Sequence, residues 1–201
     1  MEQLRTEIIQ GQLAPGTRLI EMQIARRMGT SQGPVREALR MLEHVGLVER
    51  RTRTATFVSP IVPHEIYELF KIRAVIESYA IRRAIKHITN TECDELNELI
   101  TVMHKSGLQN DIMTLFENDL LFHRRICEWS KSHVIIQAWM PLYFQIQRFI
   151  IHNHPDFFTN LTDIADTHKP IVQALREGKP NNAARVIRTH IMLVWSNYNK
   201  T

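Results

Sequence analysis

Residues 30–46, TSQGPVREALRMLEHVG, have the pattern of one amphipathic helix with well-marked ends. Thr30 or Ser31 can cap its N-terminus, and Pro34 suits its first turn because the N–H that proline lacks would be unpaired there anyway. Gly46 follows the last turn and is a typical stop signal. Apolar residues recur at the spacing of a buried helical stripe: Val35, Ala38, Leu39 and Leu42. The other face is left to solvent and carries Gln32, Gly33, Arg36 and Arg40.

The segments on either side predict a small domain around this helix. Residues 2–13 predict a short helix, and residues 20–29 predict a second helix that ends at Gly29. Residues 47–51 and 55–60 predict two short strands joined by a turn. Helix, helix, glycine turn, helix and hairpin is the layout of a winged helix-turn-helix, whose third helix enters the major groove of DNA.

The positive charge of the chain is concentrated in this segment. Residues 1–60 contain nine arginines, no lysine and six acidic residues, and they hold most of the net charge of +4. A basic module suits a polyanion, although Arg36 and Arg40 could also be solvated charges on an exposed helix. Arginine can bridge guanine or hold a phosphate, and glutamine can pair with adenine. The predicted DNA-binding residues are Ser31, Gln32, Gly33, Arg36, Arg40 and, on the wing, Arg51 and Arg53.

Three stretches closely resemble the DNA-binding domain of GntR-type bacterial transcription regulators. They are LAPGTRL (13–19), SQGPVREALRMLEHVGLV (31–48) and FVSP (57–60). The resemblance covers about residues 4–60 and implies an operator in double-stranded DNA as the partner. This chain has Gln32 where the family often has arginine, and Ala55 where the wing tip usually has glycine. Both differences bear on the operator sequence.

The rest of the chain is predicted to be helical. Pro60 and Pro63 interrupt regular structure, and a helical pattern then continues to the end of the chain. The predicted helices span about residues 64–87, 91–106, 110–130, 132–153, 161–177 and 180–198. We therefore expect a mainly α protein, with a winged helix-turn-helix in residues 1–60, a linker in 61–64 and an all-helical bundle of about six helices in 65–201.

Three histidines and one aspartate stand out because they lie on apolar helix faces. Asp119 and His123 are one helical turn apart, and His168 and His190 share stripes with aliphatic residues on two other helices. A single buried histidine is more often a satisfied core residue. A buried carboxylate, however, must be paired or bound to a cation, and helix bundles commonly build metal sites from inward-facing side chains. The set suits a divalent transition metal, zinc first, with nickel, manganese or iron as alternatives.

The same residues carry a second resemblance. DLLFHRRI (119–126) and THKPIVQALREGKPNNAARVIRTHI (167–191) look like the metal-binding helices of the FCD domain, the effector domain of FadR-type GntR regulators. YELFKIRAVIESYAIRRA (67–84) resembles the first helix of that domain. The resemblance covers residues 64–199 and implies that a small organic acid binds beside the metal and that the protein is a homodimer. It places the metal ligands on Asp119, His123, His168 and His190.

Three residues are candidates for effector binding. Arg73 either forms a surface salt bridge with Glu77, one turn later, or faces the pocket and binds a ligand carboxylate. Gln147 and Arg148 are weaker candidates, because one sequence does not fix which face of their helix turns inward.

Other classes of protein find little support in the sequence. No apolar run is long enough to span a bilayer and the N-terminus lacks a signal pattern, so the expected location is the cytoplasm. No Ser/His/Asp arrangement argues for nucleophilic catalysis, and no second carboxylate is evident beside the predicted metal ligands. We therefore predict a ligand-responsive DNA-binding transcription regulator, a repressor and not an enzyme. The alternatives are a regulator that senses the metal itself and a metal-dependent enzyme.

Overall fold

The structure is a computed structural model that describes residues 1–52, 55–157 and 160–198. Arg53, a predicted wing contact, lies outside these residues. The chain divides into two compact units, Met1–Ile66 with Met140–His152, and Tyr67–Trp139 with Asn153–Thr201. The domain bounds expected from the sequence stay a prediction. They did not place residues 140–152 in the N-terminal domain.

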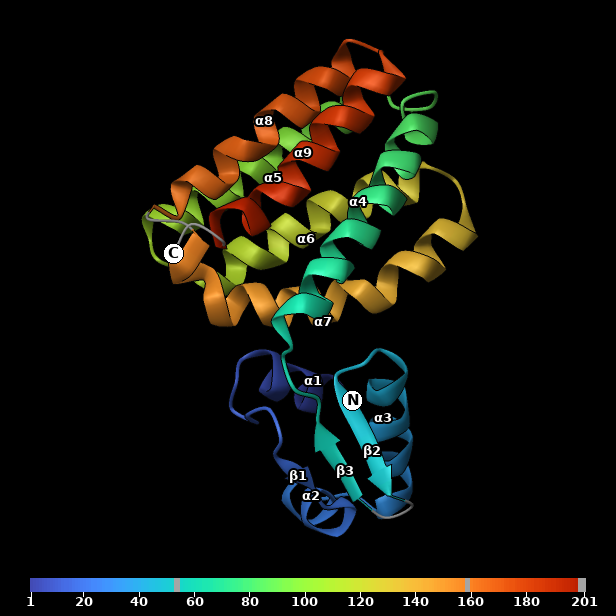
Figure 1. Ribbon diagram of the computed structural model, residues 1–201, viewed down its shortest axis with the longest axis vertical. Helices are drawn as coiled ribbons and strands as arrows, with labels where there is room; N and C mark the ends of the chain where they lie inside the picture. Colours follow the sequence, from blue (N-terminus) through green and yellow to red (C-terminus); the bar gives the residue numbers. More distant parts are fainter. Residues whose placement is uncertain (53–54, 158–159, 199–201) are drawn as a thin grey trace. The chain divides into compact units, whose positions relative to one another are not determined.

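The first unit has the predicted order of helices and strands, with one strand added (Figure 1). The elements in its N-terminal part are α1 (Glu2–Ile9), β1 (Arg18–Leu19), α2 (Glu21–Arg27), α3 (Gln32–His44), β2 (Val48–Thr52) and β3 (Ala55–Val58). The sequence did not predict β1, because a strand of two residues has no periodicity to detect. It pairs antiparallel with β3, Arg18 opposite Phe57 and Leu19 opposite Thr56, so the strand order is β1-β3-β2.

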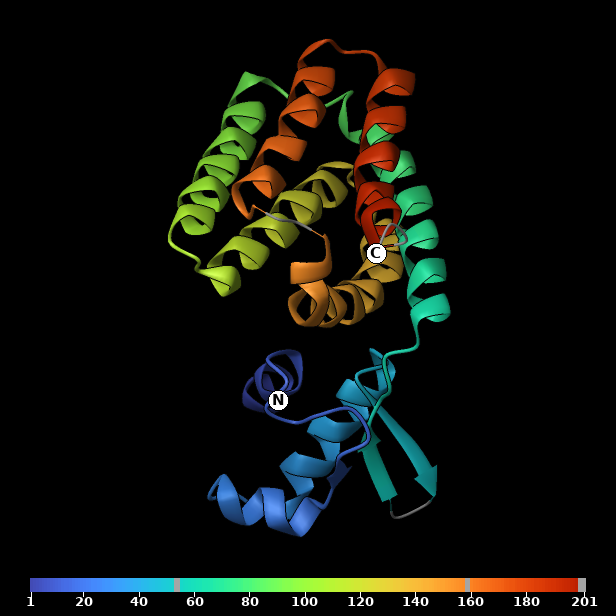
Figure 2. The ribbon, with the colours of Figure 1, turned by 60° about the vertical axis from the view of Figure 1, so that its left-hand side comes forward.

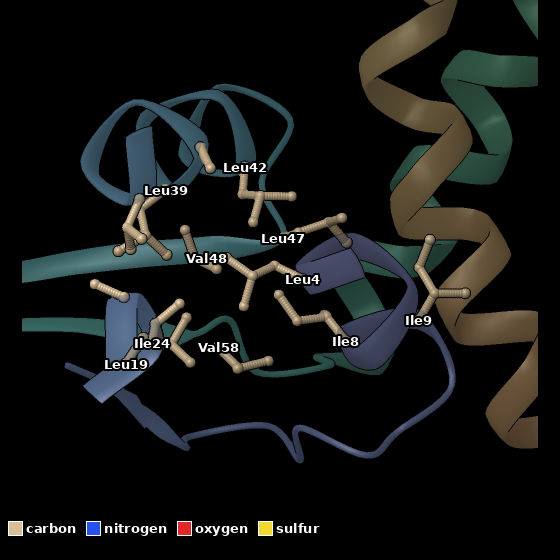
Figure 3. Close-up of a cluster of buried hydrophobic side chains, with 13 residues drawn as sticks. Leu4, Ile8, Ile9, Leu19, Ile24, Leu39, Leu42, Leu47, Val48 and Val58 are labelled. Atoms are coloured by element: carbon tan, nitrogen blue, oxygen red, sulfur yellow. The ribbon is translucent and has the colours of Figure 1, made fainter. Parts of the chain in front are cut away.

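The apolar stripe of α3 packs into the core of this unit. The four predicted stripe residues, Val35, Ala38, Leu39 and Leu42, are all buried. In Figure 3, Leu39 and Leu42 gather with Leu4 of α1 and Val48 of β2 in one apolar cluster. After α3, Gly46 has a φ of 75°, a left-handed conformation that favours glycine, and the chain turns there toward β2. Burial of the stripe leaves the opposite face of α3 exposed.

Six helices make up the rest of the described chain and agree with the predicted ones to within a few residues at each end. They are α4 (Pro63–Ala84), α5 (Asn90–Leu108), α6 (Ile112–Trp129), α7 (His133–Phe157), α8 (Thr162–Arg176) and α9 (Pro180–Tyr198). α5 packs against α6 and α8, and α8 packs against α9 (Figures 1 and 2). Among these described helices, none has both the length and the hydrophobicity needed to cross a membrane.

The start of α6 is fixed by a side-chain cap. The Asp111 carboxylate accepts a hydrogen bond from the backbone N–H of Thr114 at 3.1 Å, which satisfies one of the donors left free at a helix N-terminus. From this start, the helical period puts Asp119 and His123 on the buried face of α6 together with Phe116. The cap thus fixes where α6 begins, and burial of its apolar face turns two candidate metal ligands inward.

Candidate metal centre and DNA-binding face

Four candidate metal ligands converge from three helices of the second unit. α6 supplies Asp119 and His123, α8 supplies His168 and α9 supplies His190. One ligand atom of each residue lies within 4.8 Å of the others. Asp119, His123 and His168 are buried, and His190 is half-buried. The structure thus brings together the four residues on which the sequence-based prediction placed the metal.

Two of the histidines have a partner that decides which ring nitrogen carries the proton. His123 Nδ1 lies 2.6 Å from Oε2 of Glu77, and His168 Nδ1 lies 2.8 Å from the carbonyl oxygen of Ile164. A carboxylate and a carbonyl oxygen only accept hydrogen bonds, so Nδ1 is the donor in both rings. A neutral ring with its proton on Nδ1 has a free lone pair on Nε2, and that is the form that binds a metal.

The Nε2 atoms of these rings face other electron-rich groups of the cluster. His168 Nε2 lies 3.1 Å from Oδ1 of Asp119 but makes no hydrogen bond with it. His123 Nε2 lies 3.2 Å from Nε2 of His190, whose Nδ1 has no hydrogen-bond partner among the described residues. Lone pairs and a carboxylate this close repel one another unless a proton or a metal cation lies between them. Three imidazoles and one carboxylate suit a divalent transition metal, so the residues present fit the predicted ion.

The surroundings favour the protonation states that metal binding requires. Burial lowers the pKa of His123, and the positive charge of Arg73 lowers it further. Burial also lowers the pKa of His190, well below its ordinary value, so that neutral imidazoles are favoured. Burial alone would raise the pKa of Asp119, but a protonated His168 beside it, with smaller contributions from His123 and Arg73, outweighs burial and holds the pKa at about 2 in the metal-free cluster. The aspartate is therefore a carboxylate at neutral pH.

Glu77 of α4 is a second buried carboxylate at this cluster. Its side chain is 0% exposed. Oε1 accepts hydrogen bonds from Arg73 Nε at 2.6 Å and from Trp139 Nε1 at 2.7 Å, while Oε2 accepts from His123. Burial would raise the pKa of Glu77, but Arg73 and His123 outweigh it and hold the pKa at about 2. A carboxylate behind a ligating histidine fixes the orientation of the ring and increases its basicity.

The expectation that no second carboxylate lies beside the ligands was therefore wrong. The Arg73–Glu77 ion pair forms, as one interpretation of the sequence had it, but in the interior of the unit and not at its surface. A signal for this was present, because the helical period puts Arg73 and Glu77 on the same face of α4 as Phe70 and Ala74. Since Glu77 already accepts three hydrogen bonds, it is not a free general base.

In the first unit, α3 presents an exposed polar face. Ser31, which occupies the N-cap position without a side-chain capping hydrogen bond, and Gln32, Gly33, Arg36 and Arg40 are all exposed. A side chain at Gly33 would meet nothing within 4 Å, so the start of the helix is open to an approaching ligand. Arg51, on the wing strand β2, is exposed as well and stacks over the ring of Phe57 at 4.6 Å. Every described residue of the predicted DNA interface is therefore accessible.

Three arginines of this face are each paired with a nearby glutamate. The shortest N–O distances are 2.8 Å for Arg36 with Glu21, 2.8 Å for Arg40 with Glu37 and 2.6 Å for Arg51 with Glu49. Exposed ion pairs of this kind contribute little to stability. The carboxylates can therefore be exchanged for DNA phosphates or base edges when DNA binds.

Two further arginines extend the face and were not among the predicted contacts. Arg18 of β1 and Arg50 of β2 line a shallow surface hollow together with Gln32 and Arg36. Arg18 was missed because β1 itself was not predicted.

Two family descriptions match the chain and between them cover most of it. Residues 1–58 match "Bacterial regulatory proteins, gntR family", and residues 68–192 match "FCD domain". The chain belongs to the GntR family. The predicted FadR-like type of GntR regulator, with an FCD domain, is confirmed, and so is the mainly α fold with an N-terminal winged helix-turn-helix.

Relatives of this GntR regulator are transcription regulators and not enzymes. The chain is 31% identical over 185 residues to the "Probable D-xylose utilization operon transcriptional repressor" of Paenarthrobacter nicotinovorans. The aligned stretch covers 92% of this chain and 80% of the relative. It is 26% identical over 178 residues to the "Gluconate operon transcriptional repressor" of Bacillus subtilis, covering 87% and 73% respectively. Among solved structures, E. coli McbR/YncC has a TM-score of 0.80 at 21% identity, covering 98% of this chain and 96% of that one, which supports the fold.

Arg73 is the predicted effector-binding residue that lies next to the four candidate metal ligands of this FCD domain. Its side chain is buried, and Nε is held by Glu77. Its Nη2 atom is also buried and has no hydrogen-bond partner among the described residues. A buried donor without a partner is costly unless something accepts from it, so Arg73 has capacity to bind an anion.

The other two candidates, Gln147 and Arg148, lie in the stretch of α7 that groups with the first unit. Both are buried. Arg148 Nη2 donates to the carbonyl oxygen of Pro60 at 2.9 Å, and burial lowers the pKa of Arg148 to about 10. A role of these two residues in effector binding stays a prediction.

Proposed function

We propose that this GntR regulator is a transcriptional repressor whose FCD domain binds one divalent transition metal, zinc by preference, and a small organic acid. One observation carries the proposal: four potential ligands converge, and the Nδ1 partners of His123 and His168 leave both Nε2 lone pairs directed into the cluster. The printed names of relatives, repressors of D-xylose and gluconate operons, support repression as the mode of action.

Asp119, His123, His168 and His190 would hold the metal. A bound divalent cation supplies a Lewis-acidic centre that attracts a carboxylate. Asp119 offsets part of its positive charge, and Glu77 keeps the His123 ring in the orientation and tautomer that leave Nε2 free. Zinc is favoured because imidazole and carboxylate are among its usual ligands, although the donor set also accepts nickel, manganese or iron.

Arg73 would bind the carboxylate of the organic acid. Its Nε is fixed on Glu77, so the guanidinium is held in place before the ligand arrives, and Nη2 remains as an unused donor. A guanidinium held in advance loses less side-chain entropy on binding than a mobile one. The acid would thus be recognised by its negative charge, at a place between the cation and an arginine.

On the DNA side, the exposed face of α3 and the wing would bind an operator in the cytoplasm. Gln32, Arg36 and Arg40 would enter the major groove, and Arg51 would contact the backbone or the minor groove. A two-fold symmetric homodimer would bring two such helices to half-sites about 10 base pairs, or a multiple of that, apart.

A regulator that senses the metal alone is the second candidate. The observation in its favour is that the cluster offers three imidazoles and a carboxylate without any contribution from an organic ligand. In that case metal occupancy by itself would change the affinity for DNA.

Fluorescence anisotropy with labelled DNA from the promoter region of the chain's own gene tests both candidates. Zinc and a panel of small acids, gluconate among them, are titrated separately and together against the full chain. A change in DNA affinity that needs both zinc and an acid supports the proposal. A change with zinc alone supports the metal sensor. If the chain does not bind this DNA in footprinting, or if neither addition alters its affinity, the proposal fails.

A further inference from the structure

The first unit contains a half-open hollow between α1, the second half of α3 and the stretch of α7 that belongs to this unit. Its volume is about 550 Å³, which lies within the range of roughly 300–1,000 Å³ that is typical of small-molecule sites. The described residues that line it all belong to the first unit, whereas the four candidate metal ligands belong to the second. The hollow is therefore separate from the candidate metal centre.

The walls of the hollow are apolar and adaptable. Leu42 forms part of its floor and gathers with Leu4 in the core of the unit (Figure 3). Met41, which is 45% exposed, and the half-buried Met140 and Phe144 form the sides. Methionine side chains adapt to the shape of a ligand, and their sulfur atoms make favourable contacts with aromatic rings. An aromatic ring can also stack against Phe144. The hollow thus suits a ligand with a flat aromatic body.

The polar residues that line the hollow are basic. They are Arg5 of α1 and Arg40 and His44 of α3, and none of the described lining residues is acidic. The guanidinium of Arg5 lies over the ring of Phe144, 4.9 Å from its centroid, so a positive charge borders the aromatic wall. A carboxylate at this place would accept charge-assisted hydrogen bonds. The charge of the hollow is therefore complementary to an acid.

Both arginines are already paired, but with partners that a ligand can replace. Arg5 pairs with Glu2 and Arg40 with Glu37, and the side chains of these glutamates are 66% and 56% exposed. Exposed ion pairs of this kind contribute little to stability. A ligand carboxylate offers the same charge, and its aromatic body adds apolar area that leaves water on binding. The exchange of a glutamate for the ligand therefore favours the bound state.

We propose that this hollow is a second ligand site, which binds a monocarboxylic acid with an aromatic body. The rings fill the space between Met41, Met140 and Phe144, and the carboxylate accepts from Arg5 or Arg40. This goes beyond the proposed function, in which a small acid is recognised by a cation and by an arginine of the second unit. Here the apolar body of the ligand provides most of the affinity.

Occupation of the hollow has a consequence for DNA binding, because Arg40 belongs both to the hollow and to the exposed face of α3. An acid that holds Arg40 withdraws it from DNA. We therefore expect the bound acid to lower the affinity for the operator. This part rests on the proposed role of α3 in reading DNA, whereas the ligand site itself does not.

Calorimetry of the full chain with 2-naphthoate tests the site. We expect about one naphthoate per chain, and at least about tenfold weaker binding to Met41→Glu, which puts a negative charge into an apolar wall. Met22→Glu makes the same change at another exposed methionine, 50% exposed on α2, and should bind as the wild type does. The uncharged 2-naphthamide should bind at least about tenfold more weakly than naphthoate, and Arg5→Gln should weaken only the binding of naphthoate. Circular dichroism confirms that the variants are folded.

Four results would overturn the ligand site. They are a wild type that takes up no naphthoate, equal affinity for naphthoate and naphthamide, unchanged binding to Met41→Glu, and binding that disappears at higher chain concentration because a second copy covers the hollow. His190→Ala removes a candidate metal ligand and should bind naphthoate like the wild type. Loss of binding in that variant would move the acid to the metal cluster and would also contradict the proposal.

Anisotropy titrations with operator DNA test the consequence. Saturating naphthoate should lower the operator affinity of the wild type at least about threefold, as expected when one charged contact to DNA is lost, and should leave Met41→Glu unaffected. An unchanged operator affinity while naphthoate is bound would refute the link to Arg40. A wild type that binds naphthoate but no operator DNA even without it would contradict the proposed function and leave the ligand site standing.

Discussion

Replacing Glu77 by glutamine keeps the size of a fully buried side chain but removes its charge. In the wild type the carboxylate accepts from Arg73 at 2.6 Å, from Trp139 at 2.7 Å and from His123 at 2.6 Å. Glutamine has one accepting oxygen and an NH2 group that only donates. At least one of the three donors would therefore face another donor, and the charge of Arg73 would lose its nearest partner.

Two losses of different size follow from this change. Removing one partner of a buried ion pair costs about 3–5 kcal/mol, and we expect the free energy of unfolding of the metal-free chain to fall by roughly that amount. Removing the carboxylate behind a ligating histidine weakens metal binding by roughly 10–100-fold, which corresponds to about 1.4–2.7 kcal/mol of binding free energy. The second loss is specific to a positioning role, because a purely structural ion pair would not change metal affinity in the folded chain.

Urea unfolding followed by circular dichroism measures the first loss, and competition with a chromophoric zinc chelator measures the second. Glu98→Gln is the matched control, because Glu98 is exposed on α5 and undergoes the same chemical change. It should leave both quantities unchanged. A Glu77→Gln chain that folds and binds zinc with wild-type affinity would refute the argument that Glu77 positions His123.

Three further outcomes are expected. Arg36→Ala should abolish specific operator binding and lower the salt dependence of the remaining DNA affinity by about one unit per lost phosphate contact. The control Arg185→Ala on α9 should leave operator binding unchanged. Undiminished operator affinity of Arg36→Ala in anisotropy titrations would exclude α3 as the DNA-reading helix. His190→Ala should lose the response to zinc and acid but keep DNA binding, and a retained response would remove His190 from the ligand set. Arg73→Lys should keep zinc but weaken acid binding, measured by calorimetry, because lysine lacks the planar pair of donors; equal acid affinity would contradict the assignment.

Much of this fold could be predicted because its elements carry strong periodic patterns. The stripe of α3 and the six later helices are long enough for the apolar spacing to be unambiguous. The four-residue cluster was predictable for a related reason. Asp119, His123 and His168 sit at positions where the helical period requires burial, and buried polar groups need partners.

Other features depend on contacts between distant segments, which periodicity does not reveal. β1 exists only through its pairing with β3, so the sequence of Arg18 and Leu19 alone does not show it. Glu77 could be placed on the buried face of α4, but its hydrogen bond to His123 depends on how α4 packs against α6. The tautomer of His123 was out of reach for the same reason, since it is decided by the Glu77 carboxylate that the fold brings to Nδ1.

Metal content is the most direct test of the central claim, that Asp119, His123, His168 and His190 hold one divalent metal. The full chain is purified without chelators, loaded with zinc, dialysed and subjected to elemental analysis, alongside a folded His168→Ala chain. The account predicts about one zinc per wild-type chain, the stoichiometry of a single four-ligand site, and a large loss of zinc in the variant. A wild-type chain that carries no transition metal and retains no added zinc would contradict the account, and the four residues would then be a polar cluster of the core.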